Sequence, residues 1–413
     1  MARWRGVVLK VAWHLDVASA TLALVMTSSQ PLINEVGNIH LHLAAHIPSS
    51  IGYVTSNPIM ILFLAAGMLF GVLVSFGYRL TPVLFSPRRV TLAFSPASLR
   101  MGEVVIAIIL MIAKSIFYAI PGFPRIKLSG SELDSPFTLD ADDIARYQLA
   151  IGGTINTREE LSAPHLMLFL SAMTESAMLL LLASPWCPIN PLGAVNVRNR
   201  FELLRLDLCD LSRLVDSRTA RLKAIAHNHP RQAKRGIEWD LEVMITIPTG
   251  RRDGTMDIIF RQIFTMLELR KSQSKNTQNS SHETRSSMAT PQLSECPTHV
   301  SLSADDPLKW AAICKDYNFI HLSGAAAKAF RLPGKIAHGN HAVAKALHQL
   351  TDSRSSQPPF STSIWMEVQF RRPMVVPGVY DVSLRESSEP RKMLSVSSQG
   401  KDCATAVYGG LQQ

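Results

Sequence analysis

The sequence predicts an α+β fold in which two similar halves each place a long helix against antiparallel strands, behind an N-terminal hydrophobic region. Three observations predict it. Residues 165–183 are a long apolar stretch, followed by alternating segments around 195–197, 237–247 and 256–264. An apolar helix near residues 342–350 is likewise followed by alternating runs such as 364–370. A segment rich in Ser, Thr, Asn and Gln, residues 271–298, separates the two patterns.

The domain organisation follows from these segments. A chain of 413 residues exceeds the usual size of one domain, about 100–200 residues. We expect a hydrophobic region over residues 1–121, a first half over 122–270, a disordered linker over 271–298 and a C-terminal domain over 299–413.

The N-terminal region contains candidate membrane spans. Residues 58–76 carry no charge and are long enough to cross a hydrocarbon core of about 30 Å. Residues 11–33 are also apolar, and the basic start before them is typical of a signal anchor or first span. Residues 104–120 are interrupted by Lys114, so we expect them to lie on the membrane or on the soluble domain.

The charges around these stretches predict an orientation. Four arginines lie between the second and third stretches, and the positive-inside rule places them in the cytoplasm: Arg79, Arg88, Arg89 and Arg100. We therefore expect membrane association with the C-terminal domain on the cytoplasmic side. A start at Met101 would instead leave a cytoplasmic protein. Five dispersed cysteines without a CxxC pair agree with a reducing compartment.

Composition excludes some partners. The net charge is +10, but Lys and Arg are scattered and form no long basic run with aromatics, so no nucleic acid is expected. His40, His42 and His46 have no carboxylate or Cys beside them, so we interpret them as structural and expect no metal site there.

The densest group of reactive side chains lies in the C-terminal domain. Asp316 and His321 are five positions apart across an Asn-containing turn, so a carboxylate and an imidazole can converge on one water molecule. Gly339 precedes an apolar helix and can present its N–H at the positive end of that helix. An enolate oxygen placed there would be stabilised. A capped turn with a satisfied histidine is the alternative reading of the same residues.

The stretch from Asp316 to Asn340 resembles the MaoC-like, (R)-specific enoyl-CoA hydratase family. That family's motif runs Gly-Asp-x-Asn-Pro-[Leu/Ile/Val]-His, with His-Gly-Met downstream. Six residues fall on motif positions: Asp316, Asn318, Ile320, His321, His338 and Gly339. The resemblance continues through residues 365–384, which look like a strand pair joined at a Pro-Gly turn, and more loosely over residues 125–270.

The resemblance implies a double hot dog fold, with a long helix wrapped by a curved antiparallel sheet in each half. It implies that Asp316 and His321 are the catalytic pair, that Asn318 supports their loop and that Gly339 supplies the oxyanion N–H. Lys315 and Phe319 replace the family's Gly and Pro, and Asn340 replaces its Met. These departures leave open a degenerate site that binds thioesters without chemistry.

Other residues receive weaker assignments. The first half shows no Asp/His pair, and Asn196 stands where related sequences often carry His, so we expect this half to form an acyl tunnel wall. His338 is expected to orient the Gly339 loop at the substrate. Arg371 and Arg372 would meet coenzyme A phosphates, with a solvated strand end as the alternative. We place His341 and His348 on a helix surface, and Trp365 and Phe370 in the core.

The implied reaction is reversible hydration of a trans-2-enoyl thioester to the (R)-3-hydroxyacyl thioester, with no metal or redox cofactor. The expected partner is an acyl-CoA or acyl-ACP thioester, and a homodimer is one expected assembly. A membrane-tethered scaffold that binds acyl thioesters is the alternative function. The carrier, the chain length and the physiological direction are left open.

Overall fold

The computed structural model describes residues 77–120, 131–154, 161–209, 211–217, 219–249, 255–269, 298–352, 363–386 and 391–411. Several predicted features lie outside these ranges. They are the candidate spans at residues 11–33 and 58–76, the histidines His40, His42 and His46, and the linker except Thr298, which begins a strand.

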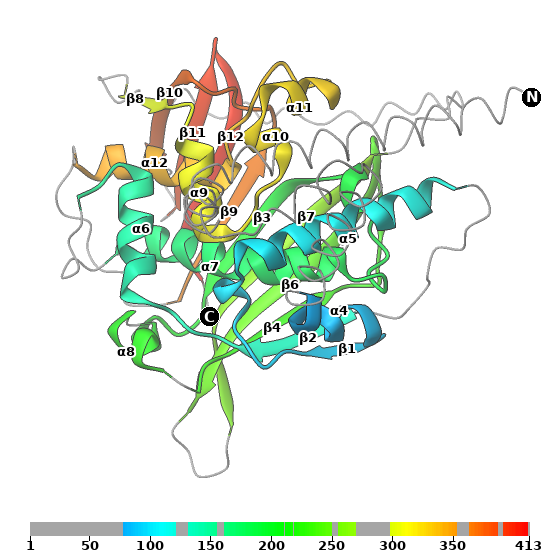
Figure 1. The fold of residues 1–413 in the computed structure, drawn as a ribbon. Coiled ribbons are helices and arrows are strands. Elements are labelled where there is room, and N and C mark those ends of the chain that lie inside the picture. The colour runs from blue at the N-terminus through cyan, green and yellow to red at the C-terminus, as the bar shows by residue number, and fades with distance from the viewer. Residues whose placement is uncertain are drawn as a thin grey trace, which may run out of the picture.

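One twelve-stranded sheet runs through the described part of the molecule (Figure 1). Its strands are β1 (Arg89–Thr91), β2 (Ser131–Pro136), β3 (Ala194–Leu203), β4 (Arg221–Ala226), β5 (Arg231–Ala233), β6 (Gly236–Pro248), β7 (Met256–Leu269), β8 (Thr298–Leu302), β9 (Ile364–Phe370), β10 (Gly378–Glu386), β11 (Arg391–Ser398) and β12 (Lys401–Gly410). The order is β1-β2-β4-β6-β7-β3-β9-β12-β11-β10-β8, with β5 pairing only β6. The predicted alternating segments therefore are strands, most of them longer than predicted.

The helices are α4 (Thr81–Phe85), α5 (Met101–Ala119), α6 (Ala141–Ile151), α7 (Ala163–Ala183), α8 (Leu211–Asp216), α9 (Asp306–Cys314), α10 (Phe319–Leu322), α11 (Gly324–Ala329) and α12 (Gly339–Asp352). Short 3-10 turns cover Tyr78–Leu80, Pro96–Ser98, Pro191–Gly193 and Leu206–Leu208. In Figure 1, α5 crosses in front of the sheet near β6 and β7, α6 and α8 lie at the left, and α9 to α12 lie in the upper part near β8 to β12.

The first half wraps five strands around α7. This helix has Pro164 in its first turn, where a missing N–H costs nothing, and it ends at Ala183, just before Ser184 and Pro185. It contacts β2, β3, β4, β6 and β7, and nearly every one of its residues is buried. The prediction of a buried globular helix over residues 165–183 is confirmed, although the helix is also long and apolar enough to cross a membrane.

The second half places α12 against β8, β11 and β12. Strands β3 and β9 pair antiparallel, so the two halves share one continuous sheet. The double hot dog prediction is confirmed. One detail differs, because β9 and β10 do not form the expected pair: β12 and β11 lie between them, and the chain crosses over after Phe370.

The sheet also reaches back into the predicted N-terminal region. Strand β1 pairs β2 in parallel, and α5 packs on α7. Lys114, the charge inside this apolar helix, donates to the carbonyl oxygens of Leu182 and Ser184 at 2.9 and 2.8 Å. It therefore caps the end of α7, where orphan carbonyls attract a cation. This agrees with α5 lying on the soluble domain, although its length and composition would also suit a membrane span.

The burial predicted from the sequence was wrong for two side chains, His341 and Trp365. His341 is not on a helix surface: it is fully buried, stacks on Trp310 and bonds the Ala150 carbonyl at 2.8 Å. Trp365 is only half-buried, because β9 alternates and turns this side chain outward, near Arg200 and Arg391. Composition alone does not tell whether a single side chain points into the core or towards solvent.

Candidate active site

A left-handed turn brings the Asp316 loop out of α9. Lys315 ends that helix with φ 62°, the region that the family's Gly favours, and its Nζ donates to the Ala312 carbonyl at 2.8 Å. The Asn318 side chain caps α10 by accepting the Ile320 N–H, and Asp316 Oδ1 accepts the Asn318 N–H at 3.2 Å. The loop thus adopts a regular turn geometry despite the substitutions at 315 and 319.

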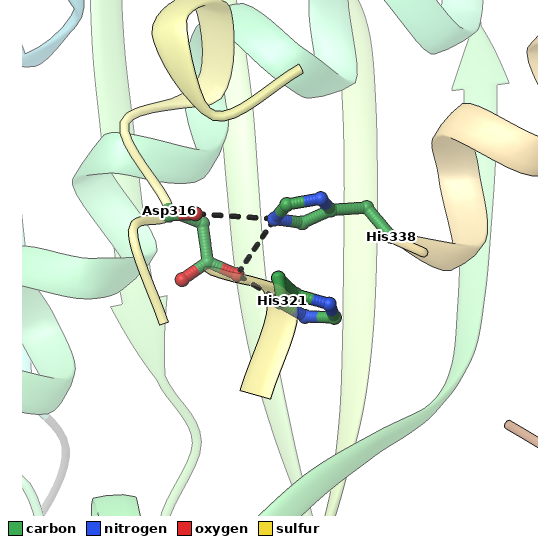
Figure 2. A group of neighbouring side chains, drawn as sticks. All are labelled: Asp316, His321 and His338. Atoms are coloured by element: carbon green, nitrogen blue, oxygen red, sulfur yellow. Dashed lines mark hydrogen bonds and ion pairs between the residues drawn. The ribbon is translucent and has the colours of Figure 1, made fainter. Parts of the chain in front are cut away.

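Asp316, His321 and His338 converge on one point (Figure 2). Asp316 Oδ2 lies 4.0 Å from His321 Nε2 and 3.7 Å from His338 Nε2. The two imidazole rings stack with their centroids 3.8 Å apart. The structure therefore brings together three residues that the sequence singled out, from α10 and from the segments before α10 and α12.

Backbone carbonyls fix the histidine tautomers. His321 Nδ1 lies 2.9 Å from the Ile336 oxygen, and His338 Nε2 lies 3.1 Å from the Asp316 oxygen. A carbonyl only accepts, so each of these nitrogens carries the proton. Burial lowers the pKa of His321. Asp316 and the hydrogen bond to Ile336 act in the opposite direction but do not outweigh burial. Burial and His321 lower the pKa of His338 well below the usual range. Both rings are neutral at pH 7, and His321 Nε2 is left as an acceptor facing Asp316.

The carboxyl of Asp316 is also perturbed. Burial raises its pKa, while His321 and the Asn318 N–H act in the opposite direction. A neutral imidazole acceptor therefore stands opposite a carboxyl whose pKa burial has raised. Such a pair can exchange a proton with a water molecule between them.

Gly339 begins α12 in a space where a larger residue does not fit. A Cβ at this position would lie 2.2 Å from Phe370 Cε1 and 2.5 Å from Cδ1. The first N–H groups of a helix have no intrahelical acceptor, so the N-terminus of α12 points free donors and the positive end of its dipole outward. The ring of Phe370 thus packs directly on the backbone of this turn.

A cavity of about 430 Å³ joins these groups. Asp316, His321, His338 and Gly339 all line it, so the carboxylate and imidazole do reach a pocket beside Gly339. Apolar side chains of α5 and α7 form another part of its wall, including Ile108, Met111, Met178 and Leu182. Arg371 and Arg372 are exposed and line the same cavity, as does the exposed Arg235 of the first half.

A buried chain of amides connects this site to the first half. Asn340 Nδ2 donates to Ser171 Oγ of α7 at 3.1 Å, and its Oδ1 accepts from Asn199 of β3 at 3.0 Å. Asn199 in turn accepts from Asn196 Nδ2 at 2.9 Å. Asn340, the departure from the family's Met, therefore holds the first turn of α12 to both α7 and β3.

Asp316, His321 and His338 are also the described residues whose donor atoms gather closely enough for a metal ion, within 4.8 Å of one another. The ring nitrogen that His338 turns toward Asp316 already carries a proton for a backbone carbonyl. A cation would have to displace that hydrogen bond, so the arrangement fits proton transfer better than metal ligation.

Sequence reasoning missed Glu175, Asn199 and the role of Asn340. Glu175 lies on α7 and lines the cavity with its side chain almost fully buried. A lone acid inside an apolar helix is an available signal, because unpaired carboxylates are rarely buried. The pairing of Asn199 with Asn340 joins residues far apart in the sequence, and a single sequence carries no trace of it.

Comparisons with known proteins address the family. Residues 284–391 match the family model described as "MaoC like domain". No curated protein sequence matches the chain.

Three solved structures are similar in fold. HtdX of Mycobacterium tuberculosis is 18% identical, with 68% of this chain and 100% of that chain covered and a TM-score of 0.49. A MaoC-like dehydratase of Phytophthora capsici is 14% identical, covering 70% and 98%, with a TM-score of 0.47. Peroxisomal multifunctional enzyme type 2 of Drosophila melanogaster is 14% identical, covering 68% and 48%, with a TM-score of 0.46. The fold assignment rests on the strand order and the two central helices. The matched residues show that the chain contains a MaoC like domain over residues 284–391.

Proposed function

We propose that this protein adds water reversibly to a trans-2-enoyl thioester and forms the (R)-3-hydroxyacyl thioester. The MaoC-like domain supports a hydratase or dehydratase role. The single observation that carries the finer proposal is the 4.0 Å gap between Asp316 Oδ2 and His321 Nε2 inside the cavity. Hydrogen bonds of about 2.7–3.2 Å to each atom let one water molecule contact both.

The proposed step balances as follows. One member of the Asp316/His321 pair takes a proton from the water, and the water oxygen forms a bond to the β-carbon. The electron pair of the alkene moves through the α-carbon onto the thioester oxygen, giving an enolate. The Gly339 N–H at the start of α12 stabilises that charge. The same pair then gives that proton to the α-carbon, which completes the addition of water and returns both groups to their starting protonation states.

The cavity supports an acyl thioester as the substrate. Its apolar wall between α5 and α7 suits an acyl chain, and the exposed Arg235, Arg371 and Arg372 suit the phosphates of the carrier. Both coenzyme A and acyl carrier protein present such phosphates, so either thioester is a candidate. Membrane association with the catalytic domain on the cytoplasmic side is part of the proposal, and fractionation of cells expressing the whole chain tests it.

The test is loss of the conjugated-alkene absorbance of enoyl thioesters with the full-length chain. Asp316→Asn should abolish the loss. The matched control is Asp381→Asn, which changes a surface Asp 3.0 Å from His299 and leaves the cavity untouched. If a folded wild-type protein leaves short, medium and long enoyl thioesters unchanged, the alternative of a binding-only scaffold replaces the hydratase.

A further inference from the structure

The first half contributes an acid to the cavity. Glu175 is on α7, one helical turn after Ser171, and its carboxyl lines the same pocket as Asp316 and His321. Its side chain is buried, and no described Lys, Arg or His forms an ion pair with it. A buried carboxyl without a cation calls for an explanation, because burying an ionised carboxylate is costly.

The Cys314 thiol links Glu175 to the Asp316 loop. The thiol donates to the Glu175 carboxyl, and its sulfur accepts the Asp316 N–H at 3.4 Å. Since α7 packs on α9, which ends at Cys314, this contact crosses from the first half to the second. Glu175 therefore touches the residue that fixes the backbone of Asp316.

Ionisable groups surround α7 on several sides. The helix α9 ends at Cys314, and Lys315 and Asp316 come directly after it. His321 lies on α10, and His338 immediately precedes α12. Lys114 of α5 bonds the far end of α7 and is close to Glu268 of β7, while His165 lies at the beginning of α7 beside His348. The rim of the pocket adds Arg235, Arg371 and Arg372. Of these, Asp316 raises the pKa of Glu175 and the Cys314 thiol lowers it.

Two carboxyls buried side by side in one pocket cannot both ionise readily. Burial and the neighbouring Asp316 raise the pKa of Glu175 well above its usual range, and the Cys314 thiol acts against this. The Asn318 N–H donates to the Asp316 carboxylate and stabilises its charge. Asp316 therefore ionises first, and Glu175 keeps its proton.

We propose that Glu175 is a positioning residue of this site: an un-ionised carboxyl that holds the Asp316 loop through Cys314 and keeps a second negative charge out of the pocket. This rests on the proposed function in one respect, since the benefit is that no anion opposes the enolate. If Glu175 ionised, its charge would repel both the Asp316 carboxylate and the enolate oxygen in a medium of low dielectric constant.

The first test does not need turnover. Infrared spectroscopy of the full chain at pH 7 should show a carboxylic-acid C=O band that Glu175→Gln removes. The matched control is Glu242→Gln, an equally buried carboxylate that lies beside Arg261 and His227 and should leave the band unchanged. A wild-type spectrum without the band, or a band that survives in Glu175→Gln, overturns the proposal.

The second test is the pH profile of enoyl-thioester hydration. Wild-type activity should fall about tenfold per pH unit once Glu175 ionises, above its raised pKa. Glu175→Gln should lack that alkaline limb, and Glu175→Asp should keep one. Coincident profiles for wild type and Glu175→Gln overturn the proposal. So does a loss of about 10²-fold at every pH, which would make Glu175 a proton-transfer group instead. A wild type inactive at all pH values removes only the proposed function, because the infrared test still decides the state of Glu175.

Discussion

Substituting Gly339 by Ala should disable the site by geometry alone. The added Cβ would lie 2.2, 2.5 and 2.8 Å from Cε1, Cδ1 and Cζ of Phe370, whereas ordinary contacts begin near 3.4 Å. Relief therefore requires a displacement of about 1.2 Å, the difference between 3.4 and 2.2 Å. Either the Phe370 ring moves into the cavity it lines, or the first turn of α12 moves away from it.

Both routes change the proposed reaction more than the fold. Overpacking of this kind costs about 1–3 kcal/mol of stability, which a folded domain can survive. A displacement of about 1 Å of a group that contacts the transition state can cost about 10²-fold in rate. We expect kcat to fall by about 10²-fold or more while the melting temperature falls modestly.

The assay is hydration of an enoyl thioester, followed beside thermal unfolding. The control is Gly324→Ala, at the start of α11, where the nearest atom to an added Cβ is the Lys335 nitrogen at 3.9 Å. Combining Gly339→Ala with Phe370→Leu should restore part of the rate, since the clash is with the ring. A Gly339→Ala enzyme with wild-type kcat would refute the assignment of this backbone to the oxyanion site.

Three further outcomes are expected. Lys315→Gly should raise the free energy of unfolding by about 0.5–1 kcal/mol in chemical denaturation and leave kcat unchanged, because it removes the strain of a Lys in the left-handed region. A lower free energy of unfolding would mean that the lost hydrogen bond from Nζ to Ala312 outweighs that strain. Asn340→Met should lower kcat more than it raises KM, because it strands Ser171 and Asn199. The control Thr174→Val, on α7 like Ser171, should leave kcat unchanged. Stability should fall as pH drops from about 6.5 towards 4, because burial lowers the pKa of His341 to about 4 and the unfolded chain then binds more protons. Denaturation of His341→Phe should show a shallower slope, and equal slopes would contradict this.

The fold was predictable because its periodicities are long. The apolar run that forms α7 and the alternation in β6, β7 and β9 extend over enough residues to identify element type. The order of the strands in the sheet was harder to predict from the sequence. The crossover from β9 to β10 depends on tertiary packing, and the Pro-Gly turn at its end reads locally like a hairpin.

The site was predictable where it is local. Asp316, Asn318 and His321 lie within one turn, so their spacing and their resemblance to a known motif placed them together. The substitution of Gly by Lys315 looked disruptive in the sequence. In the structure, the helix end still takes the left-handed conformation, since a Lys can adopt it at a modest cost.

The rest of the site was not predictable because it joins the two halves. Glu175 reaches Asp316 through Cys314, and Asn199 reaches Gly339 through Asn340, across contacts that link residues far apart in the chain. In the sequence, the first half lacks an Asp/His pair and reads as a passive wall. In the fold, the same half supplies a carboxyl and the amide chain behind the start of α12. A half without an Asp/His pair of its own can thus still control the charge and the geometry of the candidate site in the other half, which is a physical reason for the two halves to remain in one chain.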